Sequence, residues 1–331
     1  MKKYQFILEN RASLILYRFL MVNKNLFEAK TFLLPANICP IVVCTFFKAN
    51  QKIELLDISP KTLCIDEEMI KKKLAKNAEN YAGGLFNYTY GNTLCFNEFF
   101  AFLKKKYPNF VLIEDRCLCR PDIFLTFSKK YIYSDLVLFS TGKRKFLEIE
   151  EEGGFAFLHK KYEYRTDLLN EKYKKVADIF LQKAWKKENS NLEVLSQKLQ
   201  WLNMNALTIS EKEYRKKVAE KLPFCEAHKE KINNIYYSYL PKENILSDTF
   251  QQWRFQILVP KKDALLQKIF ESDLFASSHY RSLSLILGLK KNFPIASQLH
   301  SKVINLFNDF YFSEKQAIKI SEIIIEHLNE N

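Results

Sequence analysis

The sequence predicts an α/β fold, in which a mostly parallel sheet is flanked by helices and is followed by a smaller α+β region. Short apolar runs alternate with helical patterns across the first half of the 331 residues, as in strands joined by helical crossovers. Beyond Leu158 the pattern changes to long helices, and a strand with two amphipathic helices follows. The 47% hydrophobic content allows a substantial core. We therefore expect a large domain over residues 1–200 and a small one over 201–331.

Six short apolar runs are expected to form the strands of the large sheet. In chain order they are TFLLP (31–35), KIELLD (52–57), GGLFNYTY (83–90), NFVLIED (109–115), DLVLFS (135–140) and GFAFL (154–158). In such sheets, polar residues at the carboxyl ends of strands form the ligand site. The candidates at these ends are Asp57, Tyr90, Asp115 and Ser140.

The stretches between these strands carry apolar residues at helical spacing, with lysines on the other face. Those of the first half are PIVVCTFFKAN (40–50), DEEMIKKKLAKN (66–77) and CFNEFFAFLKKKY (95–107). The long helices are LLNEKYKKVADIFLQKAWKK (168–187) and KKVAEKLPFCEAHKEKINNIYYSYL (216–240). In the small region we expect a strand at FQILVP (255–260), a helix at KKDALLQKIFES (261–272) and a helix at SEKQAIKISEIIIEHLN (313–329) that Ser313 caps.

The net charge of +13 permits either a nucleic acid or an anionic small molecule as a partner. The lysines alternate with acids and aliphatic residues, as on solvated helix faces, and no basic stripe interleaved with aromatic residues accompanies them. We therefore expect an anionic metabolite and no nucleic acid.

The apolar runs are too short to cross a membrane. The longest, 32–47, contains two prolines and falls short of the roughly 20 residues that a bilayer requires. In the first residues, MKKYQFILENRAS, charged side chains occur before the long apolar stretch that a signal peptide requires. We expect a cytoplasmic protein.

Seven cysteines occur without a C-x-x-C pair or a histidine spaced as a zinc partner. Cys117 and Cys119 are expected on the same side of a strand, but two thiols do not complete a metal site. Reduced structural thiols are predicted, and no metal.

Asp115 ends one predicted strand, Ser140 ends the next, and Lys145 follows five positions later. Pyridoxal 5'-phosphate (PLP) needs a lysine for its Schiff base, a carboxylate at its ring nitrogen and donors for its phosphate. Taken singly, Asp115 could be a strand-end cap and Ser140 a turn hydroxyl. Together with Lys145 they favour a PLP site, with Lys143 and Arg144 as neighbours.

The same order resembles the DegT/DnrJ/EryC1/StrS aminotransferases, which have the PLP-dependent fold type I. The resemblance extends over nearly the whole chain. It includes the strand, helix and strand of 33–66, NYTYGN (87–92), LIED (112–115), Ser140 with Lys145, the pair Gly153 and Gly154, and the C-terminal segments 253–280 and 303–325.

The resemblance implies roles for individual residues. Lys145 would bind the cofactor and Asp115 its ring nitrogen, while the glycine pair would let the chain pass close beneath it. Its further cofactor-binding positions are Ser140, Asn10, Arg11, Ala12 and Cys39. The phosphate turn reads Asn-Arg-Ala-Ser here where the family commonly has Ser-Gly-Thr, with nine residues before it, and Leu118 stands where a glutamine or histidine is frequent. Weaker substrate candidates are Tyr90, Arg254, His279 and Tyr280, for which packing or, at Arg254, a surface ion pair are the alternatives.

The resemblance also implies a function. We expect an aminotransferase that moves an amino group from glutamate to a keto-sugar, nucleotide-linked, for a surface glycan, and that works as a homodimer. The alternatives are a small phosphorylated carbonyl acceptor and a non-catalytic member that keeps the fold. A lyase or dehydratase with the same cofactor would require the lysine to be replaced or a different proton path.

Overall fold

The computed structural model describes residues 3–124, 132–151, 153–167, 202, 207–279, 283 and 292–330. They form a seven-stranded sheet of order β1-β7-β6-β5-β4-β2-β3 and a three-stranded sheet of order β8-β10-β9. The strands of the large sheet are β1 (Tyr4–Glu9), β2 (Thr31–Pro35), β3 (Lys52–Leu56), β4 (Tyr81–Asn87), β5 (Val111–Asp115), β6 (Leu136–Ser140) and β7 (Gly154–His159). The predicted α/β fold is confirmed.

All six predicted strands form, with two differences. The run predicted over 83–90 is wrong at its end, because β4 stops at Asn87 and a 3₁₀ turn follows at Thr89–Gly91. Tyr90 has a φ of 59° there, which is left-handed and incompatible with a strand. The second difference is β1, a strand that was not predicted from the sequence.

The direction of the strands determines where the site lies. β2, β3, β4, β5 and β6 pair in parallel, whereas β7 is antiparallel both to β6 and to β1. Consequently β1 runs in the same direction as β6. The carboxyl ends of β1, β2, β4, β5 and β6 therefore meet at one edge of the sheet.

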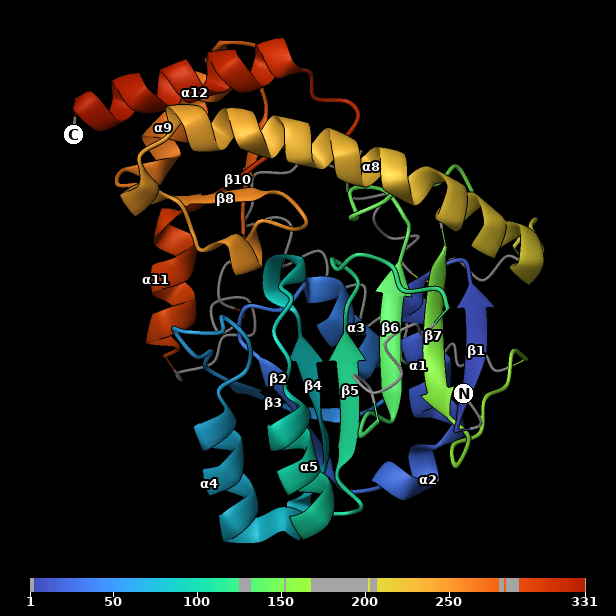
Figure 1. The fold of residues 1–331 in the computed structure, drawn as a ribbon. Coiled ribbons are helices and arrows are strands. Elements are labelled where there is room, and N and C mark those ends of the chain that lie inside the picture. The colour runs from blue at the N-terminus through green and yellow to red at the C-terminus, as the bar shows by residue number, and fades with distance from the viewer. Residues whose placement is uncertain are drawn as a thin grey trace.

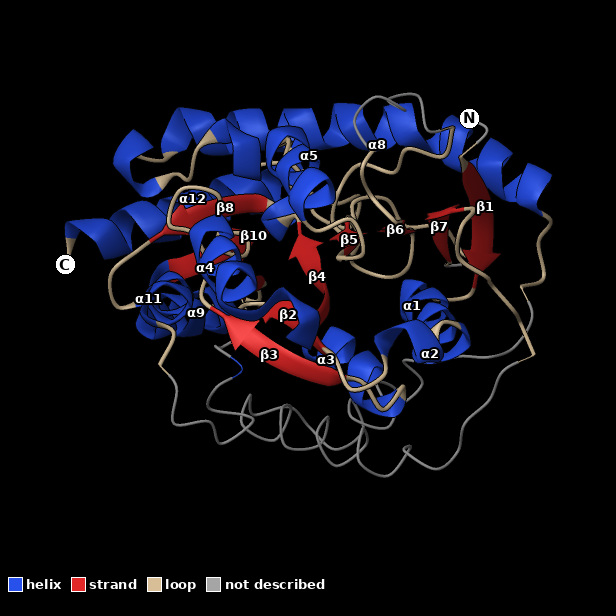
Figure 2. Ribbon diagram, turned by 90° about the horizontal axis from the view of Figure 1, so that it is seen from below, coloured by secondary structure: helices blue, strands red, loops and turns tan. Residues whose placement is uncertain are grey.

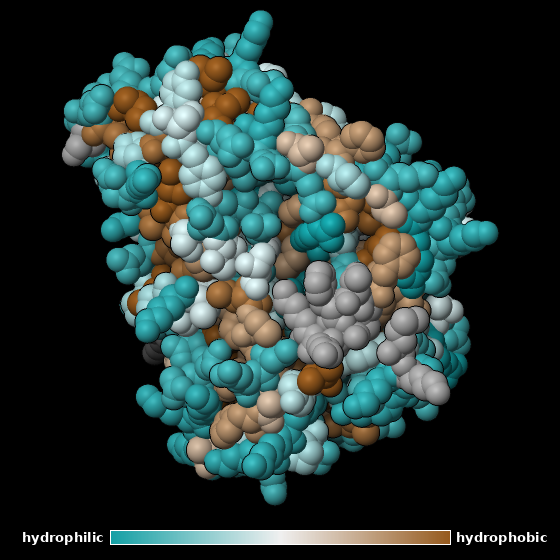
Figure 3. All heavy atoms as spheres, viewed as in Figure 1, coloured by the Kyte–Doolittle hydropathy of each residue, from teal (hydrophilic) through white to brown (hydrophobic). Residues whose placement is uncertain are grey.

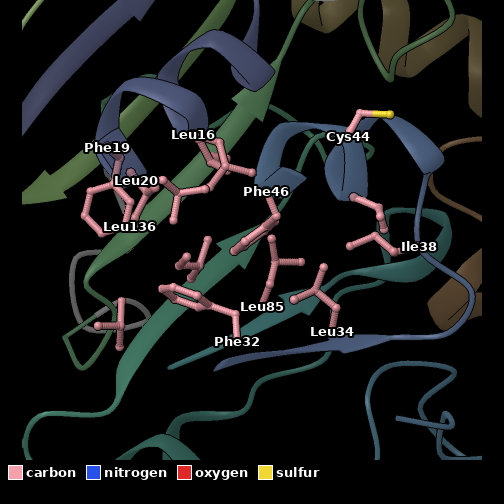
Figure 4. Packing of buried hydrophobic residues seen from close by; sticks show 14 of the residues in the cluster. Leu16, Phe19, Leu20, Phe32, Leu34, Ile38, Cys44, Phe46, Leu85 and Leu136 are labelled. Atoms are coloured by element: carbon pink, nitrogen blue, oxygen red, sulfur yellow. The ribbon is translucent and has the colours of Figure 1, made fainter. Parts of the chain in front are cut away.

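Helices cover both faces of the large sheet (Figures 1 and 2). α1 (Ala12–Val22) and α3 (Pro40–Lys48) lie on one face, and α4 (Glu67–Asn77) and α5 (Asn97–Lys106) on the other. The short α2 (Lys24–Phe27) follows α1. Figure 4 shows the apolar side chains between α1, α3 and the sheet, among them Leu16, Phe19, Phe32, Phe46 and Leu85.

The longest described helix, α8 (Glu211–Tyr239), belongs to two hydrophobic clusters. Its first half packs against the large sheet through Tyr214 and Val218, and its second half packs against the small sheet through Ile232 and Tyr236. Helix α8 begins five residues before the predicted stretch, because the Ser210 hydroxyl caps it by accepting from the Glu213 N–H. The helix predicted over 168–187 and the predicted domain boundary at 200/201 lie outside the described residues, so the domain division stays a prediction.

The C-terminal region is an α+β unit, as expected. It consists of β8 (Phe255–Leu258), α9 (Lys262–Glu271), β9 (Ala276–Ser278), α11 (Pro294–Lys302), β10 (Val303–Leu306) and α12 (Glu314–Asn329). The predicted cap of α12 is confirmed, since Ser313 and Gln316 form a reciprocal capping box. The remaining described 3₁₀ turns are Ala78–Asn80, Lys242–Asn244 and Asp248–Phe250.

Hydrophilic side chains cover most of the face seen in Figure 3, interspersed with smaller apolar areas. Within the described part of the chain, no helix combines the length and the apolar character that a membrane span requires.

Gly154 places the start of α1 against β7. It pairs with Glu9 of β1, and a Cβ atom at Gly154 would lie 2.0 Å from the backbone nitrogen of Ala12. Gly153 has a φ of 128° and faces the ring of Tyr214. The glycine pair thus allows the start of α1 and the Tyr214 ring to approach the backbone closely at the edge where the strand ends meet.

We predict that Gly154→Ala lowers the free energy of unfolding by about 1–3 kcal/mol, because the new methyl group meets rigid backbone. Gly84→Ala is the matched control, since its Cβ would meet a side chain, the Phe86 ring, at 3.2 Å. Urea unfolding of both variants measures the difference. Equal destabilisation by the two substitutions would contradict the steric argument.

Candidate active site

A cavity of about 250 Å³ lies at the carboxyl ends of the parallel strands. Its walls come from the starts of α1 and α3, the ends of β5 and β6, and the loop after β6. The lining residues are Arg11, Ala12, Ser13, Leu16, Cys39, Ile41, Val42, Thr45, Asp115, Cys117, Leu138, Ser140, Gly142, Lys143 and Lys145.

This one cavity brings together most of the residues predicted from the sequence. Those that line it are Arg11, Ala12, Cys39, Asp115, Ser140 and Lys145. Asn10 lies directly before them in the chain and is not a lining residue. Side chains more than 100 positions apart meet because each follows the carboxyl end of a strand.

Asp115 is the last residue of β5, and its orientation follows from strand alternation. Its neighbours Glu114 and Arg116 are buried and form an ion pair of 2.8 Å, with the Arg116 guanidinium 3.5 Å from the centre of the Tyr88 ring. The Asp115 carboxylate accepts from the Cys117 N–H at 3.0 Å and lines the cavity.

The loop after β6 carries Lys145. The Thr141 N–H donates to the Gly153 carbonyl at 2.9 Å, and the Lys145 N–H donates to the Gly142 carbonyl at 3.2 Å. Arg144, one residue before Lys145, has a left-handed φ of 61°. Within the described part of the chain, the Lys145 amine forms no hydrogen bond or ion pair, so it is available in the cavity.

Ser140 fixes the base of this loop. Its hydroxyl donates to the Gly153 carbonyl and accepts from the Gly142 N–H, both at 3.3 Å. Thr141 and Tyr214 share a hydrogen bond of 2.7 Å between their hydroxyl oxygens. The loop is thereby joined both to the glycine pair and to α8.

The N-terminus of α1 opens onto the cavity. Arg11 occupies the N-cap position and no side chain caps the helix there. The first N–H groups and the positive end of the helix dipole therefore favour an anion at Arg11, Ala12 and Ser13. Lys143, in the loop after β6, adds a cation to the lining of the same cavity.

Cys39 and Cys117 also line the cavity, and all seven cysteines are free thiols. The expectation that Cys117 and Cys119 occupy a strand is wrong, because β5 ends at Asp115 and they lie in the following turn. Burial, and secondly the carboxylate of Asp115, raise the pKa of the Cys117 thiol well above its usual value. No cluster of three or more metal-binding side chains occurs in the described ranges.

Three of the weaker substrate candidates, Tyr90, Arg254 and His279, do not line the cavity. Tyr90 and His279 are buried with ring centres 5.1 Å apart, and the His279 Nε2 lies 2.8 Å from the Asn37 carbonyl oxygen. Burial lowers the pKa of His279 to about 4, so its ring is neutral at pH 7 and donates this hydrogen bond. Tyr280 lies outside the described residues.

Two further expectations are corrected. Arg254 does not lie at the surface: it is buried, with its guanidinium 2.8 Å from the Ser277 hydroxyl and 3.5 Å from the centre of the Phe307 ring. Asp57 is not in the cavity either. Its carboxylate accepts from the N–H groups of Ile295 and Ala296, both at 3.0 Å, and so caps the start of α11.

The apolar wall of the cavity was not predicted from the sequence; it is formed by Leu16, Ile41, Val42 and Leu138, together with Thr45. These residues resemble any other buried apolar residue in a helix or strand, so the sequence carries no signal for them. Lys143 and Cys117 come shortly after the carboxyl ends of strands. The expectation that polar residues at these ends form the ligand site, which pointed to Asp115 and Ser140, therefore points to them too.

Fold and cavity together define a mostly parallel α/β protein with its site at the strand ends. No known family profile matches the sequence, and no curated protein matches it significantly. Solved structures of the same fold include a DegT DnrJ EryC1 StrS aminotransferase from Brucella abortus, at 14% identity and a TM-score of 0.67, over 99% of this chain and 87% of that one.

Two other solved structures are similar. Helicobacter pylori PseC, an aminotransferase involved in the biosynthesis of pseudoaminic acid, has 13% identity and a TM-score of 0.70 over 100% of this chain and 88% of its own. The E. coli GDP-4-keto-6-deoxy-D-mannose-3-dehydratase with bound hydrated PLP has 13% identity and a TM-score of 0.66, over 97% and 88%. The predicted resemblance is thus confirmed at the level of the fold.

We predict that Cys117 is alkylated more slowly by iodoacetamide at pH 7 than the exposed Cys95, since only the thiolate reacts and its formation is suppressed. Asp115→Asn should accelerate alkylation of Cys117 several-fold and leave Cys95 unchanged, because it removes a neighbouring negative charge. Peptide mapping by mass spectrometry measures both rates. An unchanged Cys117 rate in the variant would show that Asp115 does not act on this thiol.

Proposed function

We propose that the protein is a PLP-dependent aminotransferase whose cofactor occupies the cavity at the strand ends. One observation carries the proposal: Lys145, Asp115, Ser140 and the start of α1 line the same cavity. An amine, a carboxylate, hydroxyl groups and a helix N-terminus are the donor set that suits PLP. A site built for substrate alone has no need of this whole set.

Each residue has a role that its place supports. Asp115 would hold the proton on the ring nitrogen, and the start of α1 with Arg11 and Ser13 would bind the phosphate. Ser140 holds the base of the lysine loop. When bound, the cofactor supplies an electron sink for the carbanion formed at the substrate carbon.

Lys145 would act in two ways. Its Nζ would hold the cofactor, and the same amine, when it is not engaged in holding the cofactor, would move a proton to and from the amino-bearing carbon of the substrate. The apolar side chains Leu16, Ile41, Val42 and Leu138 exclude water from this part of the cavity, which strengthens the interaction between charged groups there.

For the acceptor we propose a keto-sugar, nucleotide-linked and destined for a surface glycan, with glutamate as the amino donor. Two observations support this: the similarity in fold to PseC, an aminotransferase of pseudoaminic acid biosynthesis, and the net charge of +13, which favours encounter with phosphorylated ligands. We further propose a cytoplasmic homodimer. A small phosphorylated carbonyl compound is the alternative acceptor, and a non-catalytic protein with this fold is the alternative to an enzyme.

A dehydratase is a second candidate, because one similar structure is a dehydratase with bound PLP. The Lys145 amine in the cavity favours transamination over dehydration, since a lysine there would supply the base that moves a proton to and from the substrate carbon.

We predict that the purified protein incubated with PLP absorbs visible light and forms an adduct that borohydride reduces onto Lys145. Lys145→Ala should abolish the adduct, because it removes the amine that the proposal assigns to the link. Lys143→Ala is the matched control, since it removes a lysine of the same loop and the same cavity, and it should keep the adduct. Mass spectrometry of the reduced peptide locates the attachment. A persisting adduct in Lys145→Ala, or attachment to Lys143, would overturn the assignment.

We also predict that glutamate converts the loaded protein to the aminated form with loss of the visible band, and that a nucleotide keto-sugar restores it. Stopped-flow absorbance with a panel of nucleotide keto-sugars and small keto-phosphates compares the acceptors. Restoration by a small keto-phosphate alone would favour the alternative acceptor. A protein that binds PLP but never responds to glutamate would speak against the aminotransferase.

A further inference from the structure

Trp253 connects three separate parts of the structure by hydrogen bonds. Its indole N–H donates to the Arg144 carbonyl at 2.8 Å, and its backbone N–H donates to the Tyr90 carbonyl at 3.1 Å. Its own carbonyl accepts from the Lys229 amine of α8 at 2.7 Å. The indole contact reaches the loop that carries Lys145, 109 positions away in the sequence.

Both residues whose carbonyls Trp253 binds have left-handed backbones. Arg144 has a φ of 61° and Tyr90 a φ of 59°. Such a conformation is unfavourable for a residue other than glycine and persists only where the surroundings impose it. The two Trp253 hydrogen bonds are contacts of this kind.

The conformation of Arg144 governs the direction in which Lys145 leaves the loop. The two residues are adjacent, so relaxation of φ at Arg144 would rotate the backbone that carries the Lys145 side chain. A contact between the Arg144 N–H and the Glu148 carboxylate holds the other side of the same residue. Arg144 is therefore held at its N–H by Glu148 and at its carbonyl by Trp253.

Lys229 in turn holds Trp253 from α8. Its amine is buried and donates to the Trp253 carbonyl and, at 2.9 Å, to Asn308 Oδ1. It also lies 5.1 Å from the centre of the Phe146 ring, the residue after Lys145. Burial lowers its pKa to about 8, so the ammonium form prevails at pH 7 and strengthens the hydrogen bond to Trp253.

We propose that Trp253 is a positioning residue, which fixes the left-handed turn at Arg144 and thereby directs Lys145 into the cavity, and that Lys229 holds Trp253 in place. The effect on the cofactor rests on the proposed function. The effect on the loop does not.

The test uses Trp253→Phe, which keeps an aromatic ring and removes the indole N–H. Hydrogen exchange of residues 142–149 without cofactor should accelerate at least several-fold, because the turn at Arg144 is released. With saturating PLP, the visible circular dichroism per bound cofactor should fall, and the Kd for PLP should rise roughly ten-fold. Tyr237→Phe is the control. It removes one 2.7 Å hydrogen bond to Asp248 from the exposed side of α8 and should change none of these quantities.

Lys229→Met provides a second variant if Trp253→Phe unfolds, and the same changes are expected in the same direction. Unchanged exchange over 142–149 in a folded variant would overturn the proposal. Faster exchange with unchanged dichroism and unchanged PLP affinity would overturn the link to Lys145. A wild-type protein that binds no PLP would defeat the proposed function, while the exchange measurement still tests the hold of Trp253 on the loop.

Discussion

The parallel pairing of β2, β4, β5 and β6 is the constraint on which the site depends, because it brings the carboxyl ends of these strands to one edge. Asp115 and Ser140 are the last residues of two adjacent strands in that array. The antiparallel β7 returns the chain, and β1 pairs with it, so α1 starts at the same edge. A site drawn from distant parts of the sequence is then assembled by backbone hydrogen bonds.

The charged side chains at the end of β5 lie in two different environments. Asp115 lines the cavity, whereas Glu114 and Arg116 form a buried ion pair on the opposite side. A buried pair costs much of its attraction in desolvation, and removal of one partner leaves an uncompensated charge. We therefore expect the Glu114–Arg116 pair to contribute less to stability than to the orientation of the end of β5. A rotation of the strand end that moved Asp115 out of the cavity would also break the pair behind it.

Spacing along the chain was sufficient to predict that Asp115, Ser140 and Lys145 lie together, since each is at or just after a strand end. It was insufficient wherever the partner is remote. Residues Tyr4–Glu9 form a strand because they pair with β7, about 150 positions away. Asp57 caps a helix whose first N–H groups belong to Ile295 and Ala296. The burial of Arg254 likewise depends on tertiary contacts that composition does not encode. Nothing local to these residues distinguishes a cap or a buried cation from a ligand contact.

The membership of α8 in both hydrophobic clusters has a consequence for the unfolding of the chain. A linker between two units lets one melt while the other persists, but a continuous helix that supplies core side chains to both does not. Melting of the small sheet would strip the apolar cover from the C-terminal half of α8 and fray the helix towards Tyr214, which touches both Thr141 and Gly153. The cooperativity of the chain thus extends to the lysine loop, and heat or denaturant would dismantle the cavity together with the C-terminal region.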